Sequence, residues 1–258
     1  MKLSFVIPAY NEEDLIGKCL DSILKQAVDR PVCAGRPEEI EIIVVNNAST
    51  DRTREIAQSF PGVIVVNEPK KGIVYARHAG FLASSGDFIA NIDADTMLTL
   101  GWMDKVLKAF SDNPNLVALS GPHIFYDLSR TFNFWVRLFY GVGFASYLIN
   151  RFVFRVGSLV QGGNFVVKRS ALQEIGGYNP KFDFWGEDSD LARRLHPIGD
   201  VKFTFNLPIY ASGRRIAAEG KLITAWRYGI NYFWTIFFKK PFTKNYLDVR
   251  LKNKEKQI

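Results

Sequence analysis

Two groups of acidic residues have the spacing of side chains that bind metal or move protons. Asp93 and Asp95 are separated by one alanine and follow the apolar run Phe88 to Ile92. Carboxylates at this spacing can engage a hard divalent cation, Mn²⁺ or Mg²⁺, together with its bound diphosphate. Glu187 and Asp188 stand at a predicted helix start, where an acid can act as a general base. Each pattern alone is weak, because Asp-x-Asp occurs in many surface loops and acids are favoured at helix N-termini in any case.

Residues suited to a nucleotide occur in the segment VIPAYNEE near the N-terminus. Pro8 and Ala9 would let a base approach the backbone. Tyr10 can stack on the base or the ribose, and Glu12 can accept a hydrogen bond from a ribose hydroxyl. The alternative is that Asn11 caps the following helix and the acids after it complement the helix dipole.

One amide and three arginines extend this set of polar residues. The amide oxygen of Asn47 can accept a hydrogen bond from a ring N–H of the base. Arg77, on a predicted helix, either reaches a phosphate or holds Asp93 in a structural ion pair. Arg214 and Arg215 offer two guanidinium groups for a leaving diphosphate. These residues predict a site for a nucleoside diphosphate.

The elements that would position these residues alternate between strands and helices. Short β-branched runs and amphipathic stretches follow one another over the first hundred residues, which indicates a mainly parallel sheet. We expect strands at 3–7, 40–45, 63–66, 88–92, 162–167 and 201–205, and helices over 15–24, after a cap at Ser49 or Thr50, over 73–83 and over 187–195. Ligands of open α/β sheets bind beyond the carboxyl ends of strands, and Tyr10, Asn47 and Asp93 each follow such an end.

Composition and charge limit the classes of protein. The 258 residues are 47% apolar and 23% charged, which excludes disordered and collagen-like chains and predicts one domain with a small appendage. Residues 1–130 carry 13 basic and 17 acidic groups, whereas residues 131–258 carry 20 and 9. Anionic lipid headgroups, diphosphates and nucleic acid are candidate partners for the basic half, and the excess charge also serves solubility.

Aromatic residues are concentrated in the segment 131–159, interrupted by arginines, and again in 226–238, followed by a basic tail. The pattern is typical of amphipathic helices, which either lie on a membrane surface or close the domain or a dimer. Uncharged stretches of 13 and 11 residues are shorter than the roughly 18 needed to span a bilayer. With two cysteines and no visible signal peptide, we expect a cytoplasmic protein, peripheral on the cytoplasmic face of the membrane.

Six segments together resemble the inverting glycosyltransferases of family 2, which have the GT-A fold. They are VIPAYNEE, VNNASTD, KGIVYARHAG, DAD, GGNFVVKRSALQEIGGYNP and WGEDSDLARRL, and they cover roughly residues 3–215. The resemblance implies a GT-A domain over 1–215, with an aromatic helical insert at about 131–159, and a C-terminal helix and basic tail over 216–258. It also implies that Ala9, Tyr10, Glu12 and Asn47 bind the nucleotide, that Asp93 and Asp95 serve nucleotide and metal, and that Asp188 is the catalytic base. With them we place Pro8, Arg77, Ala94, Arg214 and Arg215 on the donor side, and Trp185 and Glu187 on the acceptor side.

The departures from the family pattern refine this expectation. Asn46-Asn47-Ala48 stands where many members have Asp-Asp, and we expect UDP in preference to GDP. The sequence after residue 195 has no Gln-x-x-Arg-Trp motif of processive polymerases, which favours transfer of a single sugar. Met97 argues against the dolichol-phosphate mannose synthase subfamily. The expected function is metal-dependent transfer to a hydroxyl acceptor, lipid-linked, in glycan or cell-envelope biosynthesis.

Three other classes of protein remain alternatives. A catalytically inactive GT-A-like module could hold a nucleotide or a membrane without turnover. A nucleic-acid-binding protein would carry a recognised binding motif among its basic residues, and a nucleotidyltransferase would carry a glycine- and lysine-rich phosphate loop near the first strand. Pro8-Ala9-Tyr10-Asn11 is not such a loop.

Overall fold

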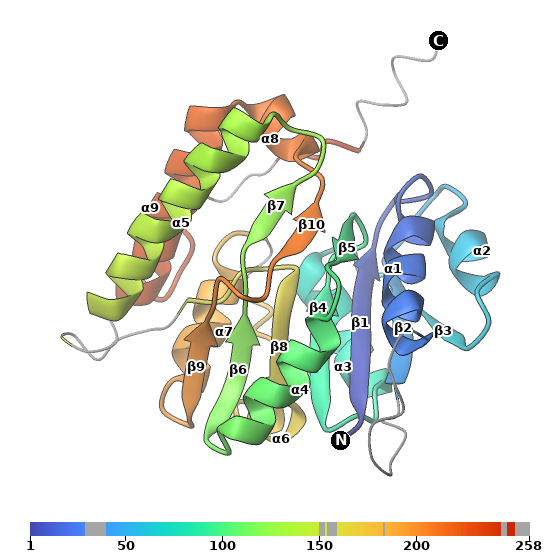
Figure 1. Cartoon of the computed structure of the whole chain (residues 1–258). Coiled ribbons are helices and arrows are strands. Elements are labelled where there is room, and N and C mark those ends of the chain that lie inside the picture. The colour runs from blue at the N-terminus through green and yellow to red at the C-terminus, as the bar shows by residue number, and fades with distance from the viewer. Residues whose placement is uncertain (29–39, 150–152, 154–158, 183, 244–246, 251–258) are drawn as a thin grey trace.

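The structure, a computed structural model, describes residues 1–28, 40–149, 153, 159–182, 184–243 and 247–250. It has the expected α/β architecture, built on one large sheet with helices on both faces (Figure 1). Its strands and helices, in chain order, are β1 (Leu3–Ala9), α1 (Ile16–Val28), β2 (Ile40–Asn46), α2 (Thr53–Gln58), β3 (Val63–Asn67), α3 (Ile73–Ala83), β4 (Phe88–Ile92), β5 (Thr96–Leu98), α4 (Trp102–Asp112), β6 (Leu116–Ser120), β7 (His123–Phe125), α5 (Arg130–Ile149), β8 (Asn164–Lys168), α6 (Arg169–Glu174), α7 (Glu187–Leu195), β9 (Asp200–Phe203), β10 (Ile209–Ala211), α8 (Arg214–Glu219) and α9 (Lys221–Phe238).

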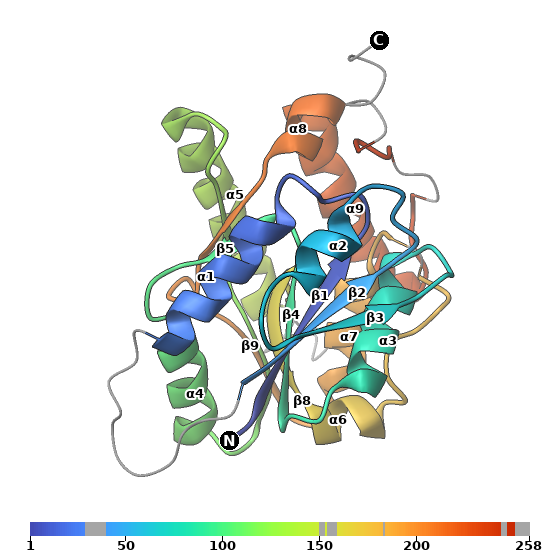
Figure 2. The same cartoon turned by 90° about the vertical axis from the view of Figure 1, so that its right-hand side faces the viewer.

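The large sheet has seven strands in the order β3-β2-β1-β4-β8-β6-β9. Only β8 runs antiparallel to its neighbours β4 and β6. The central strands are buried apolar runs, as strands covered on both faces must be. Alternate residues of these strands pack against α1 and α4 on one face and against α3, α6 and α7 on the other, and the two layers are visible in Figure 2.

A second, three-stranded sheet lies beyond the carboxyl end of the large one, in the order β5-β10-β7 (Figure 1). It was not predicted, because three-residue strands are too short to carry a periodic pattern. β5 begins directly after Asp95, and Ser212, which follows β10, donates its N–H to the Asp95 carbonyl at 3.2 Å. This small sheet therefore joins the Asp93–Asp95 turn to the chain that leads into α8.

Two long aromatic helices, α5 and α9, stand at the end of the molecule to which the strands of the large sheet point (Figures 1 and 2). α9 packs against α7 and α8, and the Lys221 ammonium lies 5.0 Å from the ring centroid of Phe132 on α5. Among the described residues, no helix combines the length and apolar character needed to cross a bilayer.

The structure corrects several local expectations. Of the three capping candidates Ser49, Thr50 and Asp51, only Asp51 contacts the start of α2: its carboxylate accepts the N–H of Thr53, where the helix begins, at 3.0 Å. Asn11 does not cap α1; it adopts a positive φ of 51°, and its side chain accepts the Thr50 N–H at 2.8 Å. The strand expected from 162 begins at Asn164, since a turn precedes it. Residues 150–152, 154–158 and most of the basic tail lie outside the described residues.

Candidate active site

Three polar positions follow the carboxyl ends of three neighbouring strands. Tyr10 follows β1, Asn47 follows β2 and Asp93 follows β4, and β1 lies between the other two strands. The N–H of Asn47 donates to the Ala9 carbonyl at 2.8 Å, which continues the strand pairing to the sheet edge. The predicted clustering of these positions at one edge is confirmed.

The Asp93-Ala94-Asp95 segment forms a turn, whereas we expected it to continue a regular strand. β4 ends at Ile92, and Thr96 donates its N–H and its hydroxyl to the Asp93 carbonyl at 3.1 and 2.7 Å. Ala94 is buried below the turn. The side chains of Asp93 and Asp95 are 35% and 22% exposed, so both carboxylates remain reachable from solvent.

Arg77 on α3 is a buried positioning residue. Its guanidinium is 3.2 Å from Asp93 and pairs with the Glu187 carboxylate at a closer distance, and its side chain is only 2% exposed. Of the two roles that the sequence left open, the structure supports the ion pair with Asp93, because so little of the guanidinium can reach a ligand. Burial raises the pKa of Glu187 to about 7, with the Arg77 charge opposing that rise. Glu187 therefore faces Arg77 and not an acceptor.

Asp188 is held at the N-terminus of α7, next to Glu187. One carboxylate oxygen accepts the Ser189 N–H at 2.7 Å, and the other accepts the Gly162 N–H at 3.2 Å. Burial raises the pKa of this carboxyl, and the backbone donors oppose the increase. A carboxylate of raised pKa in a fixed orientation is a stronger base than a solvated one, which is what proton abstraction near neutral pH needs.

The glycine pair Gly162-Gly163 connects this carboxylate with Asp93. Gly163 accepts the Asp93 N–H on its carbonyl at 3.4 Å, while Gly162 donates to Asp188. A Cβ at Gly163 would lie 2.2 Å from an Asp93 carboxylate oxygen, and its φ of 77° is unfavourable for other residues. The close approach of backbone to carboxylate therefore requires glycine at 163. The same turn thus contacts both carboxylates.

Glu12 and Asp95 share a second group of cations. Arg214, the first residue of α8, pairs closely with Glu12 and lies 3.1 Å from Asp95. Arg250 donates to the same oxygen of Glu12 at 2.8 Å, and the other Glu12 oxygen is buried without a hydrogen-bond partner. Burial, with the Glu12 charge, raises the pKa of Asp95 to about 7. Arg214 and Arg250 thus equal the two acids of this group in number.

A small cavity of about 50 Å³ lies above Pro8, Ala9 and Tyr10. Its other lining residues, most of which the sequence did not single out, are Asn47, Lys71, Gly72, Ile73, Phe184 and Arg250. The Lys71 ammonium lies 3.9 Å from the Tyr10 ring centroid and the Arg250 guanidinium 5.6 Å from it. The sequence analysis did not place Lys71 in the site, and no local signal pointed to Arg250, which is 238 residues from Glu12.

Asn47 holds in place the loop that forms part of the wall of this cavity. Its amide N–H groups donate to the Glu68 and Lys70 carbonyls at 2.9 and 2.7 Å, and its oxygen accepts the Gly72 N–H at 2.8 Å. The side chain thus holds the loop before α3 through all of these hydrogen bonds. We expected its amide to be free to pair with a base, and it is not. Its role is to shape the cavity wall.

Trp185 and Arg215 do not have the roles that we expected from the sequence. Trp185 is 3% exposed and packs edge-on against Tyr228 of α9, so it shapes the site without an open face for an acceptor. Arg215 pairs with Glu219 at 3.2 Å and lies over the Phe184 ring, away from the Arg214 group. The structure therefore separates the two consecutive arginines.

A divalent cation fits the oxygen donors at this edge. In the described part of the chain, no three His, Cys, Asp or Glu side chains form a ligand group, so the protein offers two carboxylates, Asp93 and Asp95. Mg²⁺ and similar hard cations commonly take one or two carboxylates and complete their shell with substrate phosphates. Glu12, in the same ion-paired group as Asp95, also has a buried oxygen without a hydrogen-bond partner.

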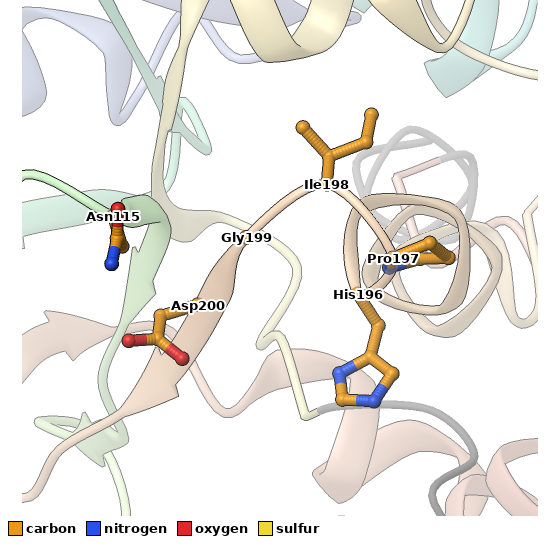
Figure 3. Close-up of a pocket in the computed structure, with 6 residues that line it drawn as sticks. All are labelled: Asn115, His196, Pro197, Ile198, Gly199 and Asp200. Atoms are coloured by element: carbon orange, nitrogen blue, oxygen red, sulfur yellow. The ribbon is translucent and has the colours of Figure 1, made fainter.

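A larger surface pocket of about 360 Å³ lies elsewhere, between the end of α7 and the start of β9 (Figure 3). Asn115, His196 and Asp200 are among its lining residues, and no Asp93, Asp95 or Asp188 borders it. It is at the amino end of β9, opposite the edge where the acids gather, and we assign it no role in the chemistry.

Comparison with known families identifies the family of this chain. The model of "Glycosyl transferase family 2" matches residues 4–176, and that of "N-terminal domain of galactosyltransferase" matches residues 154–205. The chain belongs to glycosyl transferase family 2. A curated relative of this family 2 member, the glycosyltransferase GlyA of Streptococcus pneumoniae, is 23% identical over 87% of the chain and 32% of the relative. The chain spans about a third of the length of the first curated relatives it matches.

Solved structures confirm the GT-A fold of this family 2 member. A Pyrobaculum calidifontis mannosyltransferase, solved with GDP-Man and Mn²⁺, has a TM-score of 0.66 at 21% identity over 92% of this chain and 63% of that one. Glucosyl-3-phosphoglycerate synthase of Mycobacterium tuberculosis, solved with Mn²⁺ and UDP-glucose, has a TM-score of 0.60 at 18% identity over 91% and 78%.

Proposed function

We propose that this protein transfers a single sugar, with inversion, from a nucleotide diphosphate sugar to a hydroxyl acceptor. The observation that carries the proposal is the glycine turn, because adjacent residues Gly162 and Gly163 contact Asp188 and Asp93. A proton acceptor and a carboxylate suited to the donor's metal are thereby linked by one rigid turn. Inverting transfer needs this pairing of a base with a charged leaving-group site.

In the proposed reaction, the Asp188 carboxylate removes the proton from the acceptor hydroxyl. The acceptor oxygen forms a bond to the anomeric carbon while the bond from that carbon to the diphosphate oxygen breaks. The nucleoside diphosphate leaves on the opposite side, so the configuration inverts. A positioned base contributes about a hundred- to ten-thousandfold to such a step.

The donor side would be formed by Tyr10, Glu12 and the carboxylates of the Asp93–Asp95 turn. Mn²⁺ or Mg²⁺ held by Asp93 and Asp95 would neutralise charge on the departing diphosphate. Arg214 lies beside Asp95 and supplies a fixed positive charge at the same place. The Pyrobaculum and Mycobacterium structures hold a GDP- and a UDP-sugar with Mn²⁺, and we place UDP before GDP here although Asn46-Asn47 stands where many members have an acidic pair.

The test is a panel of UDP- and GDP-sugars with and without Mn²⁺, measuring released nucleoside diphosphate and thermal shift. We expect a metal-dependent shift with one donor class, because a ligand that binds the native state raises its stability. Asp188→Asn should then lower turnover by at least about a hundredfold with donor affinity unchanged. Asp112→Asn, an exposed acid on α4, is the control. Binding without turnover by the wild type would favour the inactive module, and equal loss of binding and turnover in D188N would remove Asp188 as base.

We further propose a lipid-linked acceptor in cell-envelope or glycan synthesis, reached by peripheral docking on the cytoplasmic face of the membrane. α5 exposes Trp135 and Val142 at 61% and 69%, and α9 exposes Leu222 and Trp226 at 86% and 58%. Neither helix contains an acidic residue, and Lys239 and Lys240 follow α9. Helices with exposed apolar side chains and only basic charged residues match the interface of an anionic bilayer.

Co-sedimentation with vesicles of neutral or part-anionic lipid tests this docking. We expect binding that increases with anionic lipid and falls in the double variant Trp135→Ser, Trp226→Ser. Leu100→Ser is the matched control, because Leu100 is 83% exposed but lies outside both helices. Binding that ignores lipid charge and both aromatic residues would mean that the helices close the domain or join two copies.

A further inference from the structure

Residues 247–250 lie beside the cavity at the ends of β1 and β2, and Arg250 lines it. The Leu247 carbonyl accepts a hydrogen bond from Arg215 at 3.0 Å, and Asp248 pairs with Lys71 at 3.0 Å. Arg250 donates to Glu12 at 2.8 Å, and Val249 between them is 8% exposed. Each of these four consecutive residues is thus anchored or buried, and the anchors come from separate parts of the chain.

Two of these contacts occupy groups that the proposed donor would use. The guanidinium of Arg250 takes the Glu12 oxygen expected to accept a ribose hydroxyl, and lies 5.6 Å from the Tyr10 ring centroid. The carboxylate of Asp248 takes the ammonium of Lys71, which sits 3.9 Å from the same ring centroid. The Arg250 guanidinium thus lies where we expect the base to bind, and the Asp248 carboxylate takes the place of a phosphate on Lys71.

The volume that remains is too small for a nucleotide. The cavity lined by Arg250 and Tyr10 holds about 50 Å³, whereas ligand pockets generally hold about 300 Å³ or more. Pro8 and Ala9 belong to a buried strand of the large sheet, whereas the Arg250 side chain that lines the cavity is 28% exposed and can be displaced. Entry of a nucleoside diphosphate requires that Arg250 leave Tyr10 and Glu12.

We propose that residues 247–250 compete with the nucleotide for the donor site, and that Lys71, released from Asp248, becomes a phosphate-binding residue. The inference rests on the proposed function for the class of donor. It predicts opposite effects on nucleotide binding for the loss of Arg250 and the loss of Lys71, two cations that line the same cavity. Losing Arg250 favours the open site, whereas losing Lys71 removes a contact to the nucleotide.

The size of the effect follows from the fraction of molecules in which the site is open. If residues 247–250 are docked in nine molecules of ten, the apparent affinity for nucleotide is about tenfold weaker than the intrinsic one. The ion pairs involved are partly exposed, with Arg250 at 28% and Lys71 at 43%, which limits their strength. We therefore expect Arg250→Gln and Asp248→Asn to tighten UDP binding about 3- to 10-fold.

Calorimetric titration of the full chain with UDP and Mn²⁺ tests the inference. Arg250→Gln and Asp248→Asn should lower the Kd and Lys71→Gln should raise it. Arg52→Gln is the matched control, because Arg52 pairs with Glu13, the residue after Glu12, but does not line the cavity. Hydrogen exchange gives a measurement that does not need the nucleotide. The Arg250 amide donates to Asp248 at 3.2 Å and should exchange slowly in the wild type and faster in Arg250→Gln.

The outcomes separate this inference from the proposed function. Tighter UDP binding in the two variants, with UDP accelerating exchange at Arg250 in the wild type, would support competition. Unchanged or weaker binding in Arg250→Gln would overturn it while leaving the donor assignment intact. An unprotected Arg250 amide in the free wild type would also overturn it. A protected amide together with no nucleotide binding in any variant would reject the donor site itself, and the competition with it.

Discussion

The glycine turn between Asp93 and Asp188 permits a sharp test of the candidate site. Gly163→Ala places a methyl group 2.2 Å from an Asp93 carboxylate oxygen, and Cβ atoms essentially never come within 3.0 Å of such an atom. The carboxylate or the turn must therefore shift by close to 1 Å. Misplacement of a reacting group by about 1 Å can lower a rate about a hundredfold. We expect that loss in kcat/KM for the proposed sugar transfer.

A control must reproduce the backbone strain without the contact. Gly62 has the same φ of 77°, and a Cβ there meets nothing within 4 Å. Alanine in the left-handed region costs about 1–2 kcal/mol at either position. Both Gly163→Ala and Gly62→Ala should therefore lose stability in urea unfolding, Gly163→Ala by more because of the clash with Asp93, and only Gly163→Ala should lose activity.

The assay measures release of nucleoside diphosphate in the presence of acceptor, with thermal unfolding of each variant alongside it. A drop in kcat/KM confined to Gly163→Ala would support the role of Asp93 in the donor site. If the two variants kept equal activity, the close contact between residue 163 and Asp93 would have no bearing on the reaction. If both lost activity in proportion to stability, the effect would be strain alone, and the argument from the turn would fail.

Three further predictions concern charge. Arg77→Met should reduce the free energy of unfolding by about 3–5 kcal/mol in urea, because it leaves the buried carboxylate of Glu187 without its cation; Arg77→Lys, which keeps the charge, should lose less. The transfer rate should fall with decreasing pH from above the usual aspartate range, because burial raises the pKa of Asp188 and a protonated base cannot accept a proton; an unperturbed acidic limb in the pH-rate profile would contradict this. Chelation with EDTA should abolish transfer, restored by Mn²⁺, with Tm nearly unchanged, since Asp93 and Asp95 each keep an arginine partner; a large drop in Tm would indicate a structural metal.

The parts of the fold that the sequence predicted are those with strong local patterns. The runs at 40–45 and 88–92 are buried on both faces and contain several β-branched residues, and α3 and α7 were placed with their observed bounds. α4 has a clear apolar face but was not assigned, and β6 is a five-residue buried run that resembles any short apolar segment. The second sheet depends on contacts between distant residues and has no local signature.

The site residues were found by type, but their roles depend on tertiary structure. Asp188 and the Asp93–Asp95 pair were identified from their neighbours in sequence. Whether Arg77 contacts a ligand or forms an ion pair depends on α7, which supplies Glu187 and lies more than a hundred residues later in the sequence. In the same way, the amide of Asn47 is used by the loop before α3. The spacing of residues in the sequence does not predict which partner each of these side chains contacts, because the side chains meet only after the helices pack on the sheet.

The charges at the carboxyl edge connect the proposed metal with residues 247–250. In the described part of the chain, the carboxylates paired with Arg77, Arg214 or Arg250, together with the base, number five against these three guanidiniums: Glu12, Asp93, Asp95, Glu187 and Asp188. A divalent cation would offset part of this difference. A cation bound at Asp95 would weaken the hold of Glu12 on Arg250, and release of Arg250 would strengthen binding of the cation, because such coupling is reciprocal.

This coupling predicts that Mn²⁺ alone speeds hydrogen exchange at the Arg250 amide and that UDP with Mn²⁺ speeds it further. Arg250→Gln should bind Mn²⁺ more tightly than the wild type, whereas Arg52→Gln should not, because Arg52 is 80% exposed and pairs with Glu13. Exchange that responds to UDP but not to Mn²⁺ would mean that the nucleotide displaces residues 247–250 by occupying their place. Exchange that responds to Mn²⁺ alone would mean that charge at Asp95 and Glu12 is sufficient, so that the metal opens the site before the donor arrives.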